Sequence, residues 1–378
     1  MLNQTYKMQN MQKLYLVFQD VHTMAIIGFG FIMVFLRRYG FSSVSFNLLL
    51  VCFVIQWSML IRGFFSADFA KDGKFPISII ELIKADMDAI TIVIAMGAVL
   101  GKLTPIQYVI MAVFGVPLAV TVDHIVFRFL MVNDVGRSLV IHTFGAIFGI
   151  AVARGFVSPV TFEHPHKGSN YNSDIFAMIG GLFLFIFFPS FNAALASPEN
   201  ARHRAILNSY LALSACGVIT FAASQTMDRE KKSRFTLRHI ANSTIAGGIT
   251  IGTVANIILE PVFAVLVGCL AGFISVFSYQ IITPALLKKL RIDDTRGVFS
   301  SHALPGILAG ILGFIFAFIY DPTRYDNFLY LGLLLKLKFL NQIRDKEFFS
   351  DFDIFDVPED FDFTTRVNFI RLFSSNNF

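Results

Sequence analysis

Charged residues are scarce in this chain. Asp, Glu, Lys and Arg make up 15% of its 378 residues, whereas 55% are hydrophobic and the mean hydropathy is +0.65. Soluble globular domains contain about 25% charged residues, so the composition argues against an ordinary soluble protein and favours an integral membrane protein with several spans. The net charge of +5 is spread over the segments between apolar runs, which suits membrane loops better than nucleic-acid binding.

Cysteine is also rare. The three cysteines, Cys52, Cys216 and Cys269, all lie inside apolar runs, so we expect them to be buried small hydrophobes without a disulfide framework. Residues 1–20 are polar and mixed and lack the apolar core of a cleavable signal peptide. The first spanning helix is therefore expected to direct membrane insertion.

Long apolar runs recur along the chain. A bilayer core of about 30 Å requires roughly 20 helical residues, and runs of this length favour helices over barrel strands. The ten predicted spans are 21–36, 44–66, 86–101, 105–130, 134–157, 174–197, 204–226, 239–259, 261–283 and 302–320. Lys and Arg are enriched in one set of alternating loops, which predicts that the residues before the first span lie outside.

One motif occurs twice and divides the ten spans into two halves. In "DVGRSLVIHTFG", Asp134 precedes His142 by eight residues, and in "DTRGVFSSHALPG", Asp294 precedes His302 by eight. The first pair opens the fifth span and the second opens the tenth. Five is an odd number, so two five-span halves lie inverted in the bilayer, as in many transporters.

This symmetry predicts that the two histidines meet. Eight helical residues advance the chain by about 12 Å, which places each histidine near the middle of the membrane, approached from opposite sides. Each is followed by a GxxxG spacing, at Gly145 and Gly149 and at Gly306 and Gly310, which allows two helices to approach closely. We therefore expect a facing pair of imidazoles.

The predicted organisation has five parts. They are an N-terminal segment at 1–20, a first five-helix repeat at 21–157, a connecting loop at 158–173, a second repeat at 174–320, and an abbreviated last helix with an acidic tail at 321–378.

A pair of intramembrane histidines can also have a structural, haem-binding or metal-binding role. A single intramembrane histidine often serves only as a structural hydrogen-bond partner. Two histidines with matched aspartates at the same place in two halves argue against a purely structural role. Paired histidines ligate haem in membrane cytochromes, although the GxxxG spacings favour close approach over room for a cofactor. Zinc needs further ligands, which no nearby Cys or His supplies. We therefore predict neither a metal nor a cofactor.

Two imidazoles in a dry passage suit a small neutral molecule. A dry environment disfavours the charged imidazole, so both rings are expected to be neutral hydrogen-bonding groups. A bare cation meets a steep desolvation barrier there, whereas ammonium can shed a proton and pass as ammonia. Water, urea and carbon dioxide stay open on this reasoning. No covalent chemistry is implied, so an enzyme is not predicted.

The remaining ionisable residues in apolar runs have simpler interpretations. Asp86, Asp88, Asp123, Arg128 and Asp174 are expected near the membrane interface, where they cap helices or pair with one another. The other histidines are taken as surface or structural residues: His22, His124, His164, His166, His203 and His239.

Several long segments resemble a known family. They are "FQDVHTMAIIGFGFIMVFLRRYGFSSVSFNLLL", "GAVLGKLTPIQ", "DVGRSLVIHTFGAIFG", "SDIFAMIGGLFLFIFFPSFNAAL", "AGGITIGT" and "HALPGILAG". Together they resemble the Rhesus (Rh) glycoprotein branch of the ammonium transporter superfamily, collinearly from about residue 18 to 320. The resemblance implies a homotrimer of inverted five-helix repeats with a hydrophobic ammonia-conducting pore through each subunit.

The resemblance also assigns roles to the two motifs. His142 and His302 fall on the family's twin pore histidines. Asp134 falls on its vestibule-side aspartate and Asp294 on the matching aspartate of the second half, with roles in recruitment or structural support.

A gate and its neighbour follow from the same resemblance. Phe191 matches an aromatic gate residue and Asn192 the amide beside it, whereas Met87 stands where the family has a second gate phenylalanine. A thioether can still close an apolar gate, but the constriction is expected to be looser. Arg137 replaces a small residue near the vestibule and is expected to repel cations there.

The resemblance thus implies an ammonium or ammonia transporter, in a homotrimer or a heterotrimer with paralogues, in contact with lipid and in the plasma membrane. Methylammonium is a further expected substrate. Two alternatives stay open: a channel for carbon dioxide or another small neutral gas, and a non-conducting scaffold or sensor subunit. The run at 327–340 begins like the family's last helix but is short, and the acidic stretch at 351–363 resembles its cytoplasmic terminus.

Overall fold

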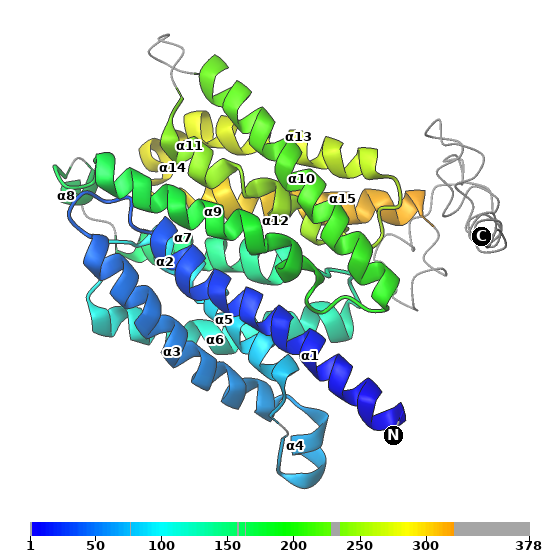
Figure 1. Ribbon diagram of the computed structural model, residues 1–378. Helices are drawn as coiled ribbons and strands as arrows, with labels where there is room; N and C mark the ends of the chain where they lie inside the picture. The colour runs from blue at the N-terminus through cyan, green and yellow to red at the C-terminus, as the bar shows by residue number, and fades with distance from the viewer. Residues whose placement is uncertain (1, 76, 157–158, 163, 228–234, 321–378) are drawn as a thin grey trace, which may run out of the picture.

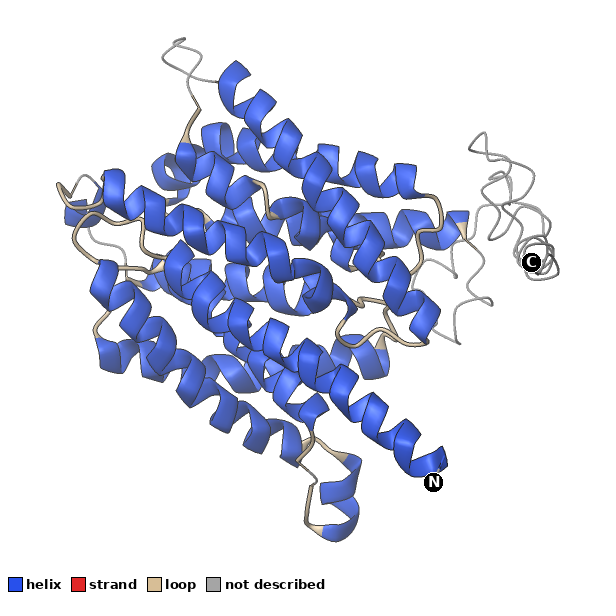
Figure 2. Ribbon diagram, in the orientation of Figure 1, coloured by secondary structure: helices blue, strands red, loops and turns tan. Residues whose placement is uncertain are grey.

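A computed structural model describes residues 2–75, 77–156, 159–162, 164–227 and 235–320. Within these ranges the chain is helical and contains no strand, as Figure 2 shows, which confirms the predicted all-α class. The predicted short helix at 327–340 and acidic stretch at 351–363 lie outside the described residues.

The helices follow one another through short connections. The α-helices are α1 Leu2–Thr23, α2 Phe29–Ile32, α3 Gly40–Phe64, α4 Ala67–Asp72, α5 Ile79–Ala98, α6 Pro105–His124, α7 Phe144–Gly155, α8 Pro159–Phe162, α9 Tyr171–Ala193, α10 Glu199–Thr226, α11 Leu237–Ser243, α12 Ala246–Gly252, α13 Pro261–Phe277, α14 Thr283–Leu290 and α15 Leu304–Ile319. Five π-helical segments adjoin them: η1 Met24–Gly28, η2 Ile125–Phe129, η3 Ser138–Thr143, η4 Ser278–Ile282 and η5 Phe299–Ala303.

Among the described residues, eight helical stretches are long and apolar enough to cross a membrane. They are Gln12–Ile32, Gly40–Phe64, Pro105–Phe129, Ser138–Gly155, Tyr171–Ala193, Glu199–Thr226, Pro261–Leu290 and Phe299–Ala317. The predicted spans at 86–101 and 239–259 are not among them. The first corresponds to α5, which has 20 residues but carries four ionisable side chains in its first half. The second is divided into the short helices α11 and α12, so the ten-span arrangement stays a prediction.

The first candidate span begins earlier than the expected residue 21. Helix α1 is unbroken through the polar N-terminal segment, and its span starts at Gln12. The polar groups of this region are held by other helices: Asp20 accepts a hydrogen bond from the Ser190 hydroxyl at 2.6 Å, and His22 contacts Asp86 at 2.9 Å. Polar side chains near the start of this span therefore have partners on other helices.

The two halves of the molecule repeat one another. Helix α3 packs against α5 and α6, and α10 packs in the same way against α12 and α13. The π-helical segments recur too, because η2 and η4 extend α6 and α13, whereas η3 and η5 precede α7 and α15. In Figure 1 the blue helices α1 and α3 lie on one side of the molecule and α10 and α13 on the other. This recurrence supports the predicted five-helix repeats, whose bounds at 21–157 and 174–320 stay a prediction.

Helix α5 lies at the centre of the bundle. Its residues from Ala85 to Ala98 are all buried, in contact with α3, α6 and α7. Large apolar side chains instead face outward from the peripheral helices, as at Phe114 of α6 and Val218 of α10, which are 67% and 70% exposed. Such an apolar exterior suits contact with lipid. Cys52 is exposed, contrary to expectation, because it lies on the outer face of α3, whereas Cys216 is buried.

Candidate histidine pair at the centre of the bundle

His142 and His302 meet inside the protein. They lie on η3 and η5, and both side chains are completely buried. Their Nδ1 atoms are 3.2 Å apart, and the rings are nearly parallel, at 11°, with centroids separated by 5.3 Å. Residues 160 positions apart in sequence thus share one hydrogen bond. The repeated motif predicts this juxtaposition, while its role in conduction is a separate question.

The two aspartates hold the turns that precede the histidines. The Asp134 carboxylate accepts hydrogen bonds from the backbone N–H groups of Ser138 and Leu139, each at 2.9 Å, and from the Thr253 hydroxyl at 2.7 Å. Both carboxylate oxygens are therefore occupied. These contacts favour structural support over direct recruitment of a cation.

Asp294 repeats this arrangement in the second half. Its carboxylate accepts from the backbone N–H groups of Gly297, Val298 and Phe299 at 2.8–3.0 Å. Both aspartates are buried, at 2% and 8% exposure. Each thus orders the turn that carries its histidine into the bundle.

Backbone contacts extend the equivalence. The N–H of Gly136 donates to the Gly252 carbonyl at 2.8 Å, and that of Arg296 donates to the Gly97 carbonyl at 3.2 Å. Each of these donors lies two residues after its aspartate. The acceptors lie at helix ends of the other half, because Gly252 is the last residue of α12 and Gly97 the next-to-last residue of α5. Each histidine turn is therefore anchored to the opposite repeat.

The two GxxxG spacings serve different contacts. A Cβ at Gly310 would lie 2.8 Å from Leu139 of η3, so the second spacing does bring α15 close to the other histidine segment. A Cβ at Gly149 would instead lie 2.6 Å from the backbone of Ala95. The first spacing therefore packs α7 against α5, and the expectation that both face the opposite histidine helix is wrong for this one.

Aromatic rings surround the pair. Phe188 stacks on His142 with centroids 5.8 Å apart, and Phe191 contacts the same ring edge-to-face at 5.9 Å. Phe29 stacks on His302 at 6.1 Å. The predicted gate residue Phe191 thus lies beside the pair, and the predicted gate residue Met87 is buried on α5 in the same apolar cluster.

Asn192 connects three helices. Its side-chain amide donates to the Ser209 hydroxyl at 2.8 Å and to the Gly248 carbonyl at 2.9 Å, which joins α9 to α10 and α12. Its Oδ1 is buried and has no hydrogen-bond partner in the described part of the chain. The contacts favour a supporting role.

The pair does not have the geometry of a metal or haem site. Metal–nitrogen bonds are about 2.0 Å long, so two histidines on opposite sides of one iron would hold their nitrogens about 4 Å apart. Here the nitrogens share a hydrogen bond at 3.2 Å. Among residues with described positions, no three His, Cys, Asp or Glu side chains gather as a metal site.

Arg137 is not a free cation. Its guanidinium is paired with Asp123 and lies over the Phe127 ring, 4.5 Å from the centroid. Asp123 also pairs with Arg62 at 3.0 Å, and Arg62 pairs with Asp88 at 2.6 Å. The expected repulsion of cations by Arg137 is therefore offset by an acidic partner. Asp86 and Asp88 are buried within the bundle, where Asp86 pairs with His22 and Asp88 with Arg62. The sequence alone does not predict these partners.

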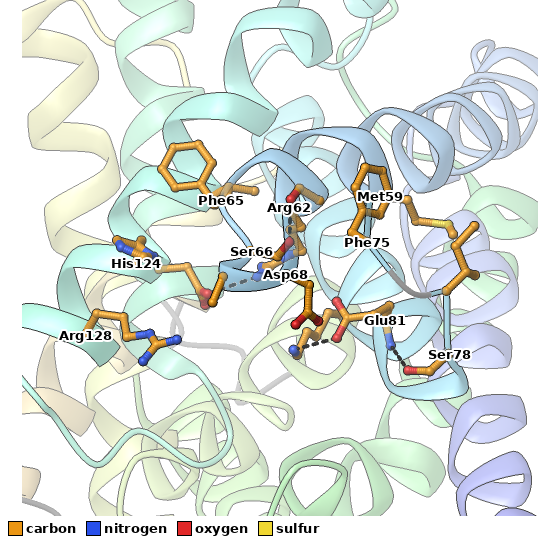
Figure 3. Close-up of a pocket in the computed structure, with 16 residues that line it drawn as sticks. Met59, Arg62, Phe65, Ser66, Asp68, Phe75, Ser78, Glu81, His124 and Arg128 are labelled. Atoms are coloured by element: carbon orange, nitrogen blue, oxygen red, sulfur yellow. Dashed lines mark hydrogen bonds and ion pairs between the residues drawn. The ribbon is translucent and has the colours of Figure 1, made fainter. Parts of the chain in front are cut away.

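A polar cavity of about 360 Å³ opens beside this ion network, at the end predicted to face outward. Figure 3 shows Asp68 and Glu81 on one side of it and His124 and Arg128 on the other, with Arg62 on the wall between them. Neither His142 nor His302 lines the cavity. It is a neighbouring feature rather than the centre of the site.

Arg296 is the functional candidate that sequence reasoning missed. Its side chain is 1% exposed, and its Nη1 lies 3.4 Å from Nε2 of His302. An arginine two residues after Asp294, where the first half has Gly136, is the signal that could have identified it.

Comparison with known proteins places this geometry in a family. The model of the Ammonium Transporter Family matches residues 2–343. The chain belongs to the Ammonium Transporter Family. It is accordingly a multi-pass integral membrane protein, with eight candidate spans in its described part.

Curated relatives in this family are Rh-type proteins. "Ammonium transporter Rh type C-like 2" of Danio rerio is 44% identical over 317 residues, covering 84% of this chain and 64% of the relative. "Ammonium transporter Rh type A" of Rattus norvegicus is 43% identical over 304 residues, covering 80% and 66%. The chain thus spans slightly less than two thirds of the length of these two relatives. Their identity confirms the resemblance to the Rh branch.

Solved structures agree on the fold. The structure described as "Nitrosomonas europaea Rh50 and mechanism of conduction by Rhesus protein family of channels" aligns with a TM-score of 0.74 at 34% identity, covering 81% of this chain and 79% of that one. Saccharomyces cerevisiae Mep2 aligns with a TM-score of 0.64 at 17% identity, over 82% and 73%. The second likeness concerns the fold alone.

Proposed function

We propose that this protein is an Rh-type ammonium transporter that conducts neutral ammonia past His142 and His302. The observation that carries the proposal is the buried, hydrogen-bonded histidine pair inside an aromatic surround, in a chain of the Ammonium Transporter Family. Relatives named as Rh-type ammonium transporters support the substrate. In this proposal the protein lets ammonia cross the membrane and forms no covalent bond with it.

The apolar rings around the histidine pair determine which form of the ligand can pass. A charged ligand would lose its hydration among Phe29, Phe188 and Phe191 without gaining a counter-charge. Ammonium therefore gives up its proton before it reaches the pair, and neutral ammonia exchanges hydrogen bonds with the imidazoles. Phe191 and Met87 act as the apolar gate on this path, at the entrance predicted to face outward.

Supporting residues keep the pair in register. Asp134 and Asp294 order the two turns, and Asn192 joins the helices that surround His142. Exposed apolar side chains on the peripheral helices provide contacts for lipid and for further subunits, consistent with a homotrimer or a heterotrimer with paralogues in the plasma membrane.

Flux through reconstituted vesicles tests the proposal. Purified protein in liposomes loaded with a pH-sensitive dye is given ammonium, methylammonium or carbon dioxide gradients, and empty liposomes set the baseline. We expect internal alkalinisation by ammonium well above that baseline. Accelerated carbon dioxide entry without ammonia flux would instead favour a gas channel, and no flux from correctly assembled protein would favour the scaffold.

A further inference from the structure

Arg296 lies against the histidine pair on the side of His302. Its Nη2 donates to Oδ1 of Asn242 at 2.6 Å, its Nε is 3.4 Å from the Ile32 carbonyl, and its Nη1 is 3.4 Å from Nε2 of His302. These partners belong to α11, α2 and η5. The guanidinium therefore closes the end of the pair that lies nearer the face predicted to be cytoplasmic.

The charge of Arg296 has no ion-pair partner among the described residues. Its side-chain contacts are an amide, a carbonyl and an imidazole, whereas Arg137, which is 9% exposed, is paired with Asp123. The nearest acidic residue in sequence, Asp294, has its carboxylate occupied by backbone N–H groups. A buried cation without a directly paired carboxylate is costly to hold, which points to a role for the charge itself.

The direction of the hydrogen bonds from Arg296 to His302 and from His302 to His142 follows from which groups can donate. A guanidinium can only donate, so Nε2 of His302 accepts from Arg296. A neutral imidazole has one donor and one acceptor nitrogen, so Nδ1 of His302 carries the proton and donates to Nδ1 of His142. The remaining nitrogen of His142, Nε2, then carries that ring's proton.

That last nitrogen is left available. Nε2 of His142 is buried and has no hydrogen-bond partner in the described part of the chain, and the rings of Phe188 and Phe191 contact this imidazole. A buried N–H without a partner requires an acceptor. Ammonia offers a lone pair to accept this hydrogen bond, and ammonium has none.

We propose that Arg296 is a positioning residue that fixes the tautomers of both histidines, so that His142 presents Nε2–H to a neutral ligand with a lone pair. The positive charge also repels ammonium and protons at the inner end of the pair, so no proton passes along the imidazoles. This inference rests on the proposed ammonia pathway and names the ligand chemistry that the pathway selects.

Nitrogen NMR of ¹⁵N-histidine-labelled protein in lipid tests the tautomers directly. His142→Gln and His302→Gln identify the two sets of signals. The expected result for the wild type is Nδ1–H on His302 and Nε2–H on His142. The opposite protonation of either ring in the wild type would overturn the inference, whatever the variants do.

Arg296→Met removes the charge at similar length, and Arg296→Lys retains it. We expect both tautomers to be populated in Arg296→Met, the wild-type pattern to persist in Arg296→Lys, and no change in the control Arg154→Met, which removes an exposed arginine from the last turn of α7. An unchanged pattern in folded Arg296→Met would show that another group sets the tautomers.

Charge movement provides the functional readout. On solid-supported membranes, an ammonium pulse is expected to give a current at least tenfold larger for Arg296→Met than for the wild type, with the control Arg154→Met resembling the wild type. Equal currents in Arg296→Met and the wild type would show that the charge of Arg296 is not a barrier to ammonium or protons. Absence of ammonia flux together with the expected tautomers would contradict the proposed function and leave the hydrogen-bond assignment standing, so the two failures are distinguishable.

Discussion

Arg137 and Gly297 occupy equivalent backbone positions in the two halves of the molecule. Each follows its turn aspartate by three residues, and each has a left-handed backbone, with φ of 56° and 83°. Glycine adopts this conformation freely, whereas other residues are disfavoured there. The sharp turn that directs each histidine into the bundle therefore requires this conformation twice, once at a glycine and once at an arginine held by Asp123.

Gly297→Ala is expected to destabilise the protein. The left-handed backbone costs an L-residue about 1–2 kcal/mol, and a Cβ at this position would collide with the Tyr279 ring. The apparent melting temperature in detergent is the measurement. Gly155→Ala is the matched control, because a Cβ there meets no atom within 4 Å, and it should leave stability nearly unchanged. Equal stability of the two variants would show that the turn is not constrained.

The facing histidines could be predicted from the sequence, because a repeated Asp-to-His spacing in two inverted halves has few geometric solutions. The stabilising role of Asp134 and Asp294 could also be predicted, because each stands at the start of a helix where backbone N–H groups need acceptors. The ion network of Arg62, Asp88 and Asp123 was not, since its members lie on separate helices and pair only after packing. Hydropathy also predicts one continuous span at 239–259, whereas the structure divides it between α11 and α12, because hydropathy does not reveal a turn inside an apolar run.

Asp123→Asn is expected to weaken the fold by leaving two guanidinium groups without a full counter-charge. Removing one partner of a buried ion pair costs about 3–5 kcal/mol, and the slight exposure of this network places the expected loss at the lower end. The double variant Asp123→Asn with Arg137→Met should be less destabilised than Asp123→Asn alone, because one unpaired cation is gone. Thermal unfolding of the four proteins of this cycle measures the coupling; strictly additive losses would mean that Asp123 and Arg137 do not interact.

Asp134→Asn is expected to lower stability more than Asp72→Asn. An amide retains one acceptor oxygen but turns its NH₂ group toward backbone N–H donors, which leaves a buried donor unsatisfied at a cost of about 1–3 kcal/mol. Asp72 is exposed on α4 and provides the control. Melting temperatures in the same detergent compare them. If Asp134→Asn kept full stability but lost ammonium dependence of flux, recruitment of the cation would be the better description of this carboxylate.

Ammonia flux through His142→Ala is the most direct test of the central claim that the ligand passes the histidine pair. The variant is reconstituted beside the wild type at equal protein density, with assembly checked by size-exclusion chromatography. Loss of the imidazole removes a hydrogen bond worth about 1 kcal/mol in the dry passage, together with the partner of His302. We expect protein-mediated ammonia permeability to fall by about fivefold, the factor to which 1 kcal/mol corresponds. Undiminished permeability in correctly assembled His142→Ala would contradict the account.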